Sequence, residues 1–345
     1  MMKKISFILF FLIVLNCSNQ PAVVPFERIK VLMDTFVQIA IYDQNRSPSE
    51  LEQIVAAAFD QIATIERLTN VYDDSSVVSR INREAGYKAV MLDSSLCQLL
   101  DQSRDIYELS NGAFDITIET VKQLWNFSPE NPRIPGDSLL QAHLRWVGMN
   151  HIRRQGDVVQ FDSPEVKIDL GGIAKGFAVD RAMEVLKSHG ITDAMVNAGG
   201  DLQTIASDLT RGKRRVWIKH PRQSDRLIGY FPMDQGCVAT SGDYERFFLY
   251  DSVRYHHILN PKTGYPARGC VSVTIKAPTT TMADALATAV FVLGPEEGMA
   301  LIERLPEVEG VILFEQARAL QWLASSGLRR QFKLHSSETN SPYQK

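Results

Sequence analysis

The spacing of apolar residues along the chain predicts several amphipathic helices. Over 49–68, one helical face is formed by apolar residues at intervals of three and four: Leu51, Ile54, Val55, Ala58, Ile62 and Ile65. Ser49 followed by Glu52 has the pattern of a capping box at the start of this helix. Further helices are expected at 93–109, 173–189, 282–293 and 296–305.

Shorter segments that alternate between apolar and polar residues, or are rich in Val and Ile, predict strands. The longest runs from Arg28 to Tyr42, and 157–161 with 166–170 has the pattern of a hairpin. Other strands are expected at 194–197, 215–219, 227–231, 255–259, 271–276 and 311–314. Because strands cluster with helices between them, without strict alternation, we predict an α+β fold with mainly antiparallel sheets.

The first residues have the pattern of an export signal. Lys3 and Lys4 precede an apolar run, Ile5 to Leu15, that is too short to span a bilayer comfortably. Cys17 follows, as in a bacterial lipoprotein signal. We therefore expect a signal peptide at 1–16, a lipidated Cys17 and a tether at 17–27. The mature protein would lie in the cell envelope, anchored to a membrane and facing the periplasm or the exterior; plain secretion is the alternative.

Composition and charge narrow the remaining possibilities. The chain has 345 residues, of which 45% are hydrophobic and 22% charged, and these values are ordinary for a globular protein. The net charge of −3 and the absence of a long basic block argue against a nucleic-acid partner. Cys97, Cys237 and Cys270 have neither disulfide nor metal-site spacing. The polar sequence after Arg330 predicts a disordered tail over 331–345.

Two glycine-bearing turns are candidates for holding an anion. Lys167–Asp180 predicts a strand, a turn at Gly171-Gly172 and a helix, whose first backbone amides can bind a phosphate. Asn197–Asp201 places polar side chains beside two glycines at a strand end. A tight strand-to-helix turn without a ligand explains the first stretch equally well, and a simple Asn/Asp turn is the preferred interpretation of the second.

Two further stretches carry side chains capable of chemistry. His256 and His257 are adjacent, so on a strand they face opposite sides and only one can serve a given site as a base. Asp284 and Thr288 are four residues apart and share one face of the expected helix. Their oxygens suit Mg²⁺, although Thr and Asp are also ordinary residues of a helix start.

Taken in order along the chain, six stretches resemble the FAD:protein FMN transferases, the ApbE-type flavin transferases. They are Ala113–Asp115, Ile168–Gly176, Asn197–Asp201, Ala239–Gly242, His257–Gly264 and Ala283–Thr288. The resemblance runs from about Met33 to about Phe314 and implies one two-lobed catalytic domain over 28–330. It also implies transfer of FMN from FAD to a Thr hydroxyl of a membrane electron-transport protein, with Mg²⁺ as cofactor and AMP as product.

The resemblance assigns roles to particular residues. The flavin contacts it implies are Met33, Tyr72, Ala113, Phe114, Asp115, Asp169, Lys175 and Leu259. The implied Mg²⁺ ligands are the Gly172 carbonyl, Asp284 and the Thr288 hydroxyl, and His257 is the candidate that activates the acceptor. Two positions depart from the family pattern: Asp34 stands where Gly usually follows the Met, and Ala287 where some members carry a second acidic ligand.

Two alternative functions use the same residues. In an FAD pyrophosphatase, water would attack the diphosphate and the products would be FMN and AMP. In a flavin-carrying lipoprotein without catalytic activity, FAD would remain intact, and the oxygens of Asp284 and Thr288 would have no chemical role.

Overall fold

The computed structural model describes residues 24–43, 45–207, 211–212, 214–223, 225–317 and 319–335. The expected signal peptide and Cys17 therefore lie outside the described residues. Within that part of the chain, no helix is both long enough and apolar enough to cross a membrane.

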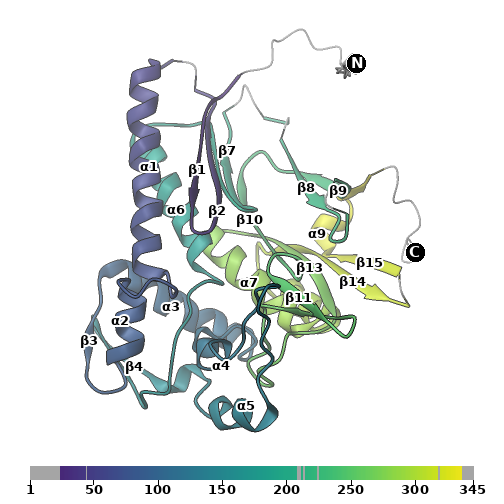
Figure 1. Ribbon diagram of the computed structural model, residues 1–345. Helices are drawn as coiled ribbons and strands as arrows, with labels where there is room; N and C mark the ends of the chain where they lie inside the picture. Colours follow the sequence, from purple (N-terminus) through teal and green to yellow (C-terminus); the bar gives the residue numbers. More distant parts are fainter. Residues whose placement is uncertain are drawn as a thin grey trace, which may run out of the picture.

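An antiparallel sheet forms the centre of the molecule (Figure 1). In the described chain it has eight strands in the order β1-β2-β6-β7-β10-β13-β14-β15, and each neighbouring pair is antiparallel. The strands are β1 Phe26–Leu32, β2 Thr35–Ile41, β6 Ala194–Ala198, β7 Asp201–Ile205, β10 Gly236–Gly242, β13 Cys270–Ala277, β14 Glu309–Gln316 and β15 Ala319–Ala324. The predicted α+β class with mainly antiparallel sheets is confirmed.

Helices and small sheets complete the fold. The α-helices are α1 Pro48–Thr69, α2 Val77–Glu84, α3 Ser94–Leu109, α4 Glu119–Lys122, α5 Asp137–Leu144, α6 Ala174–Ser188, α7 Thr280–Leu293, α8 Pro295–Arg304 and α9 Ser326–Arg329. Short 3-10 helices span Ile116–Ile118 and Met149–His151. The small sheets contain β3 Val90–Met91, β4 Ile152–Gln155 and β5 Val158–Phe161; β8 Arg215–Lys219, β9 Leu227–Pro232 and β16 Lys333–Leu334; and the pair β11 Phe247–Tyr250 and β12 Val253–His256.

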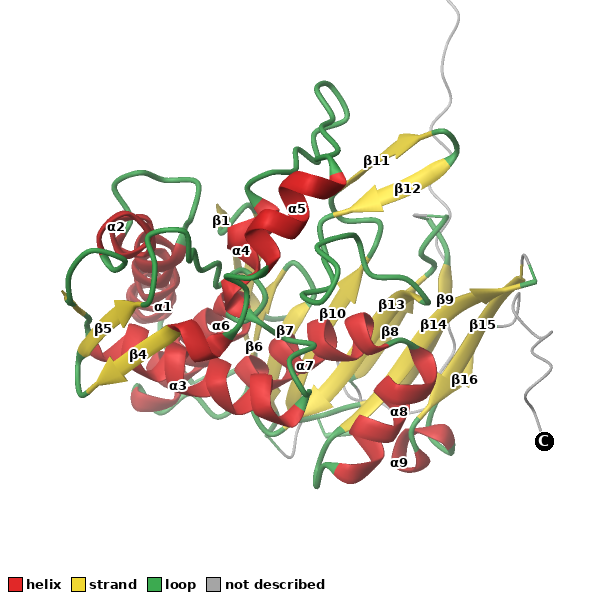
Figure 2. Ribbon diagram, turned by 90° about the horizontal axis from the view of Figure 1, so that it is seen from below, coloured by secondary structure: helices red, strands yellow, loops and turns green. Residues whose placement is uncertain are grey.

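The central sheet has a separate apolar layer on each face. Helices α6, α7 and α8 lie on one face (Figure 2), where Ile312 of β14 packs into the larger core. The neighbouring residues Val311 and Leu313 belong to a second core with Phe231 of β9. Alternate residues of one strand thus enter different cores, as the two-residue period of a strand requires.

Three predictions at the N-terminal side were wrong in detail. The expected strand Arg28–Tyr42 is a hairpin, because Met33 and Asp34 both have positive φ and reverse the chain. The hairpin begins at Phe26, inside the segment expected to be tether. Helix α1 is capped by Ser47, which accepts from the Glu50 amide at 3.2 Å, so the Ser49–Glu52 capping box does not form; Pro48 takes the first helical position.

The expected hairpin of 157–161 with 166–170 does not exist. β5 pairs with β4 and β3, whereas 166–170 is extended but outside any sheet. The Asn82 side chain takes the place of a strand there: its amide donates to the Ile168 carbonyl at 2.9 Å, and its oxygen accepts from the Ile168 amide at 2.8 Å. Alternate burial of Val166, Ile168 and Leu170 produced the strand-like pattern.

Two other segments also differ from expectation. The expected strand 255–259 ends at His256, and only an isolated bridge joins Leu259 to Pro266. The start of the expected disordered tail is ordered: Lys333 and Leu334 form β16 against β9, and Phe332 packs into the second core. The polar composition of this segment predicted disorder, but burial of the Phe332 ring gives its start an apolar contact that orders it.

Helices α6 and α7 approach so closely at their first turns that residue 176 has to be glycine. A Cβ atom on Gly176 would lie 2.3 Å from the Thr280 carbonyl oxygen and 2.9 Å from the Asp284 Cβ. The contact therefore fixes the spacing of the two helices.

We expect Gly176→Ala to lower the free energy of unfolding by about 1–3 kcal/mol, because the added methyl group overpacks this contact. Helix propensity alone would give the opposite sign, about 1 kcal/mol of stabilisation. Gly136→Ala is the control, since a Cβ there meets nothing within 4 Å. Denaturant unfolding of both variants decides the point; a Gly176→Ala protein as stable as wild type would contradict the tight contact.

Candidate active site

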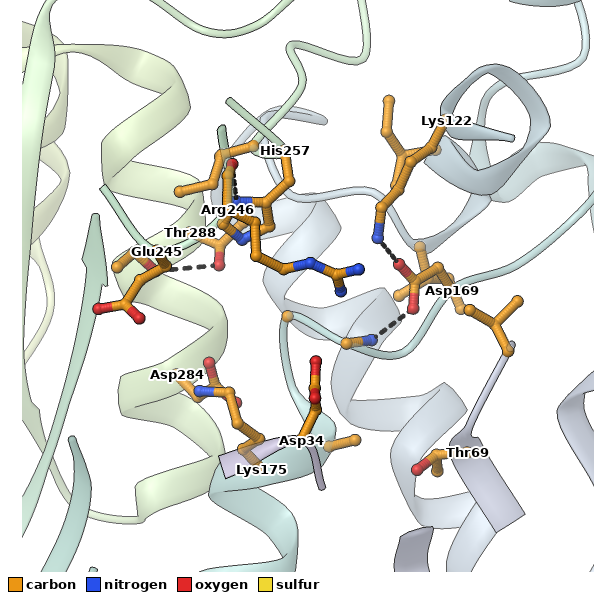
Figure 3. Close-up of a pocket in the computed structure, with 18 of the residues that line it drawn as sticks. Asp34, Thr69, Lys122, Asp169, Lys175, Glu245, Arg246, His257, Asp284 and Thr288 are labelled. Carbon is orange, nitrogen blue, oxygen red and sulfur yellow. Dashed lines mark hydrogen bonds and ion pairs between the residues drawn. The ribbon is translucent and has the colours of Figure 1, made fainter. Parts of the chain in front are cut away.

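A cavity of about 840 Å³ lies between the β1–β2 turn, the glycine turn before α6 and the start of α7. All of the candidate residues within the described chain line it: Met33, Tyr72, Ala113, Phe114, Asp115, Asp169, Gly172, Lys175, His257, Leu259, Asp284 and Thr288. Figure 3 shows the polar members around the opening, with Lys175 and Asp284 on one side and Lys122 and Asp169 on another. The structure thus brings together residues that are spread over more than two hundred positions of the sequence.

The β1–β2 turn closes one side of the cavity. Met33 and Asp34 have φ values of 53° and 59°, the left-handed pair of a tight two-residue hairpin turn. Glycine is the easiest residue at such a position, and Asp is among the few others that tolerate it. The Met33 amide donates to Glu66 at 2.8 Å, which ties the turn to the end of α1.

The segment 113–115 forms an apolar wall. Ala113 and Phe114 are buried, and the Phe114 ring lies beside Gly172. Asp115 caps the following 3-10 helix by accepting from the Thr117 amide at 2.8 Å and the Thr117 hydroxyl at 2.6 Å. Burial raises the pKa of Asp115 to about 6. Its carboxylate therefore has a structural task in addition to facing the cavity.

Lys122 and Asp169 form an ion pair on the cavity wall. The sequence did not predict this pair. Burial alone would raise the pKa of Asp169, but the Lys122 ammonium outweighs it and holds that pKa below its usual value. The other Asp169 oxygen accepts from the Gly171 amide at 2.8 Å. The pair thereby holds the glycine turn in place.

A second charged cluster joins Lys175, Asp201 and Asp284. The Lys175 Nζ lies 2.5 Å from Asp201 Oδ2, while Asp201 Oδ1 is buried and has no hydrogen-bond partner among the described residues. Burial and the nearby Asp201 raise the pKa of Asp284 to about 7, with Lys175 acting in the opposite direction. Two buried carboxylates thus share one ammonium, and the site favours a further positive charge.

Helices α6 and α7 cap one another with these acidic side chains. Asp180 accepts from the Thr280 and Thr281 amides, each at 2.9 Å, and Asp284 Oδ2 accepts from the Gly176 amide at 3.0 Å. The N-cap of α7 is Thr279, whose hydroxyl accepts from the Met282 amide, so Asp284 does not cap α7, the helix to which it belongs. The helix-start interpretation therefore does not account for Asp284.

The donors expected for Mg²⁺ lie close together. Thr288 is one turn after Asp284, and a Cβ on Gly172 would be 3.3 Å from the Thr288 hydroxyl oxygen. Within the described chain, no group of three or more His, Cys, Asp and Glu side chains could hold a metal ion. One carboxylate, one hydroxyl and one carbonyl fit Mg²⁺, which usually keeps water and substrate oxygens among its ligands.

The two histidines face opposite ways, as predicted. His256 is buried, with Nε2 at 2.9 Å from the Ala267 carbonyl oxygen, whereas His257 lines the cavity. His257 Nδ1 lies 3.2 Å from the Arg246 carbonyl oxygen, which places a proton on Nδ1 and leaves Nε2 as an acceptor. Burial, followed by the positive charge of Lys122, lowers the pKa of His257 to about 3, so the ring is neutral at pH 7.

Arg246 and Lys122 line the cavity beside Tyr72, and of these three residues the sequence predicted a role only for Tyr72. Tyr72 is at the exposed edge of the cavity, with the Arg246 guanidinium 5.2 Å and the Lys122 ammonium 5.9 Å from its ring centroid. Asp201, the partner of Lys175, ends the stretch Asn197–Asp201, and its place next to two glycines was the available signal. Arg246 lies between two of the family stretches and in neither of them. Lys122 stands in no such stretch, and only the fold brings it to Asp169.

Comparison with known proteins now identifies the family. The model described as the ApbE family matches residues 33–312, well over half of the chain. The chain belongs to the ApbE family.

Relatives in this family share both sequence and fold. The chain is 31% identical over 330 residues to the FAD:protein FMN transferase of Treponema pallidum, covering 91% of this chain and 90% of the relative. It is 32% identical over 271 residues to that of Vibrio cholerae, covering 77% and 79%. The ApbE protein crystal structure from Thermotoga maritima aligns with a TM-score of 0.81 at 35% identity, covering 89% of this chain and 99% of that one. The flavin transferase ApbE from Vibrio cholerae aligns with a TM-score of 0.78 at 27% identity, covering 89% and 100%.

We expect Lys122→Met to lower the free energy of unfolding of this ApbE-family chain by about 3 kcal/mol at pH 7, because the buried Asp169 loses its partner. A carboxylate whose folded-state pKa is depressed stabilises the fold above its unfolded pKa, about 4, and loses that effect as pH falls through the folded value. The difference from wild type should therefore shrink at pH 3.

Urea unfolding at pH 7 and pH 3 measures this difference, with Lys122→Arg as the control that keeps the charge. An equal loss at both pH values would mean that Lys122 contributes packing and not charge.

Proposed function

We propose that this chain is a Mg²⁺-dependent FAD:protein FMN transferase that moves FMN from FAD onto a threonine hydroxyl of a protein acceptor and releases AMP. One observation carries the proposal: a single cavity is lined by the α6 glycine turn, the Asp284–Thr288 pair and the neutral His257. A diphosphate, a divalent cation and a hydroxyl need those three environments respectively.

The FAD diphosphate would lie at the start of α6. The Gly171-Gly172 turn lets a ligand approach the backbone, and amides at a helix N-terminus favour an anion. Lys175 is partly exposed to the cavity and adds a positive charge there. The isoalloxazine ring would pack against the apolar wall made by Ala113, Phe114 and Leu259. Met33 and Tyr72 would lie at the edge of the ring. Asp115 and Asp169 would supply polar contacts.

The Gly172 carbonyl, Asp284 and Thr288 would hold the Mg²⁺. When bound, the ion supplies positive charge to the diphosphate oxygens. The second acidic ligand of some relatives is absent here: Ala287 is fully buried and lines no part of the cavity. Asp201 and Asp284 provide the negative field that favours a cation at this place.

His257 would act as the base. Its Nε2 accepts the proton of the acceptor hydroxyl as the threonine oxygen bonds to the phosphorus of the FMN moiety. The bond from that phosphorus to the bridging oxygen breaks, and the bridging oxygen leaves with AMP. The low pKa of His257 keeps Nε2 unprotonated at neutral pH, and the Arg246 carbonyl orients the ring.

The proposed location in the cell envelope rests on the N-terminal sequence, and the proposed acceptor rests on the family resemblance. A lipid on Cys17 would hold the enzyme at the outer side of a membrane in the bacterial envelope, next to flavinylated subunits of membrane redox complexes. The first strand of the described chain begins at Phe26, nine residues after Cys17. Mass spectrometry of the mature N-terminus tests the anchor, and an unmodified terminus at another residue would contradict it.

Incubation with FAD, Mg²⁺ and an acceptor protein tests the activity. Flavin fluorescence on the acceptor in a denaturing gel, with one AMP per flavin, supports transfer. AMP and free FMN without a labelled acceptor would indicate a pyrophosphatase, and intact FAD would indicate a flavin carrier.

We expect Asp284→Asn to reduce AMP release by about a hundredfold or more, because a neutral amide is a poor Mg²⁺ ligand. The Asn oxygen can still accept from the Gly176 amide, so the melting temperature should stay close to that of wild type. Asp284→Ala removes both contributions and provides the comparison. A folded Asp284→Asn enzyme with normal activity would show that Asp284 is only a cap for α6.

We expect His257→Ala to slow acceptor labelling by about 10²–10⁴-fold, the usual contribution of a general base. FAD affinity, measured by flavin fluorescence quenching, should change little, since the ring is assigned to proton transfer. Weaker FAD binding with an unchanged rate at saturating FAD would instead place His257 in the pocket wall.

A further inference from the structure

The strands β11 and β12 form a hairpin that stands apart from the central sheet beside α5 (Figure 2). We call residues 247–256 the arm. The two residues that flank the arm both line the cavity: Arg246 precedes β11, and His257 follows β12. The His257 amide donates to the Arg246 carbonyl at 3.1 Å. The point where the arm joins the body of the protein therefore also positions His257, the candidate general base.

One face of the arm is held by aromatic packing. Phe248 and Tyr255 are opposite one another in the ladder, and their rings stack with centroids 5.3 Å apart. Phe127 packs on Phe248 at 6.4 Å, and Trp125 packs on Tyr255 at 6.0 Å. The inner half of the arm is therefore fixed to the body of the enzyme.

The same face continues beyond this support. Tyr250 and Val253 lie two residues further along each strand and oppose one another, so they share the face of Phe248 and Tyr255. Tyr250 is 56% exposed and Val253 40% exposed, and Leu249 on the other face is 62% exposed. Asp251 and Ser252, both with positive φ, form the turn between them. The arm thus ends in an apolar tip made of Leu249, Tyr250 and Val253.

The position of the tip favours a protein as its occupant. Strands rise about 3.3 Å per residue, so Tyr250 lies roughly 10 Å from the base of the arm. A protein that brings a hydroxyl to His257 has the arm beside it, and it can contact the tip while the hydroxyl is in the cavity. Tyrosine and large apolar side chains are typical anchors of protein interfaces.

The charge of the tip argues against a lipid surface. Residues 247–253 contain no Lys or Arg, and the turn carries the acidic Asp251. An anionic membrane attracts basic segments, and it would repel this one. Arg254, the nearest basic residue of the arm, lies over the Phe247 ring at 3.6 Å and near Asp243.

From this placement we infer that the apolar tip of the arm docks the acceptor protein and so determines which protein hydroxyls reach His257. The inference rests on the proposed transferase function and deepens it. FAD binding and attack by water need no contact with the tip. The arm therefore acts on the protein substrate alone.

The test combines Leu249→Ser, Tyr250→Ser and Val253→Ser in the full chain. The probe is a purified, unflavinylated subunit of a membrane redox complex that wild type labels. We expect kcat/KM for labelling to fall about tenfold or more through a higher KM, as loss of interface anchors produces. Slow AMP release from FAD without acceptor should stay within about twofold of wild type, which also shows that the variant is folded. Single Tyr250→Ser provides a milder variant with the same expected direction.

The matched control is Tyr87→Ser with Met91→Ser, apolar residues that are 76% and 68% exposed but outside the arm and the cavity. It should label the acceptor at the wild-type rate. Unchanged labelling by the arm variant, or an equal fall in both labelling and AMP release, would overturn the docking role. So would a loss of binding to phosphatidylglycerol-containing vesicles with normal labelling, which would assign the tip to the membrane. A wild-type protein that releases AMP but labels no acceptor would overturn the transferase function itself, and the role of the arm with it.

Discussion

The rest of the site depends on the reciprocal hydrogen bonds by which a carboxylate of α6 caps the start of α7 and a carboxylate of α7 caps the start of α6. Asp180 of α6 accepts the free amides of α7, and Asp284 of α7 accepts an amide of α6. Gly176 allows the approach, because any Cβ there would collide with α7. Both helix starts are thereby fixed beside one cavity, and with them the glycine turn, Lys175 and Thr288. Unpaired helix ends are costly when buried, so the pairing stabilises the fold and builds the site by the same contacts.

Charge is distributed unevenly around this frame. On one wall, Lys122 and Asp169 balance one another and hold the turn at Gly171. Near α7, two buried carboxylates share the Lys175 ammonium, and burial together with the neighbouring Asp201 raises the pKa of Asp284. A cation near α7 would offset the excess negative charge there. On the other wall, burial and then the Lys122 ammonium lower the pKa of His257, so its ring is neutral. The two halves of the proposed reaction, charge stabilisation and proton removal, thus have different electrostatic environments within one cavity.

The fold also separates the two substrates. The β1–β2 turn, segment 113–115 and α6 surround the space proposed for FAD, and all of them pack into or against the larger core. His257 instead follows a hairpin outside the central sheet, and none of residues 247–256 lines the cavity. A small ligand can be enclosed while a protein approaches from the side of the arm.

The sequence by itself determined the strongly periodic elements α1, α3, α6, α7 and α8, because their apolar faces repeat at helical spacing whatever they pack against. It also contained the short motifs of the family, each of which contributes at least one residue to the cavity. Only the tertiary structure decided that Val166–Leu170 is no strand, since the Asn82 amide satisfies its backbone from 86 positions away. The pairing of Lys122 with Asp169 and of Asp284 with Gly176 likewise depends on long-range contacts, and no local pattern encodes where a distant charge or helix end will lie.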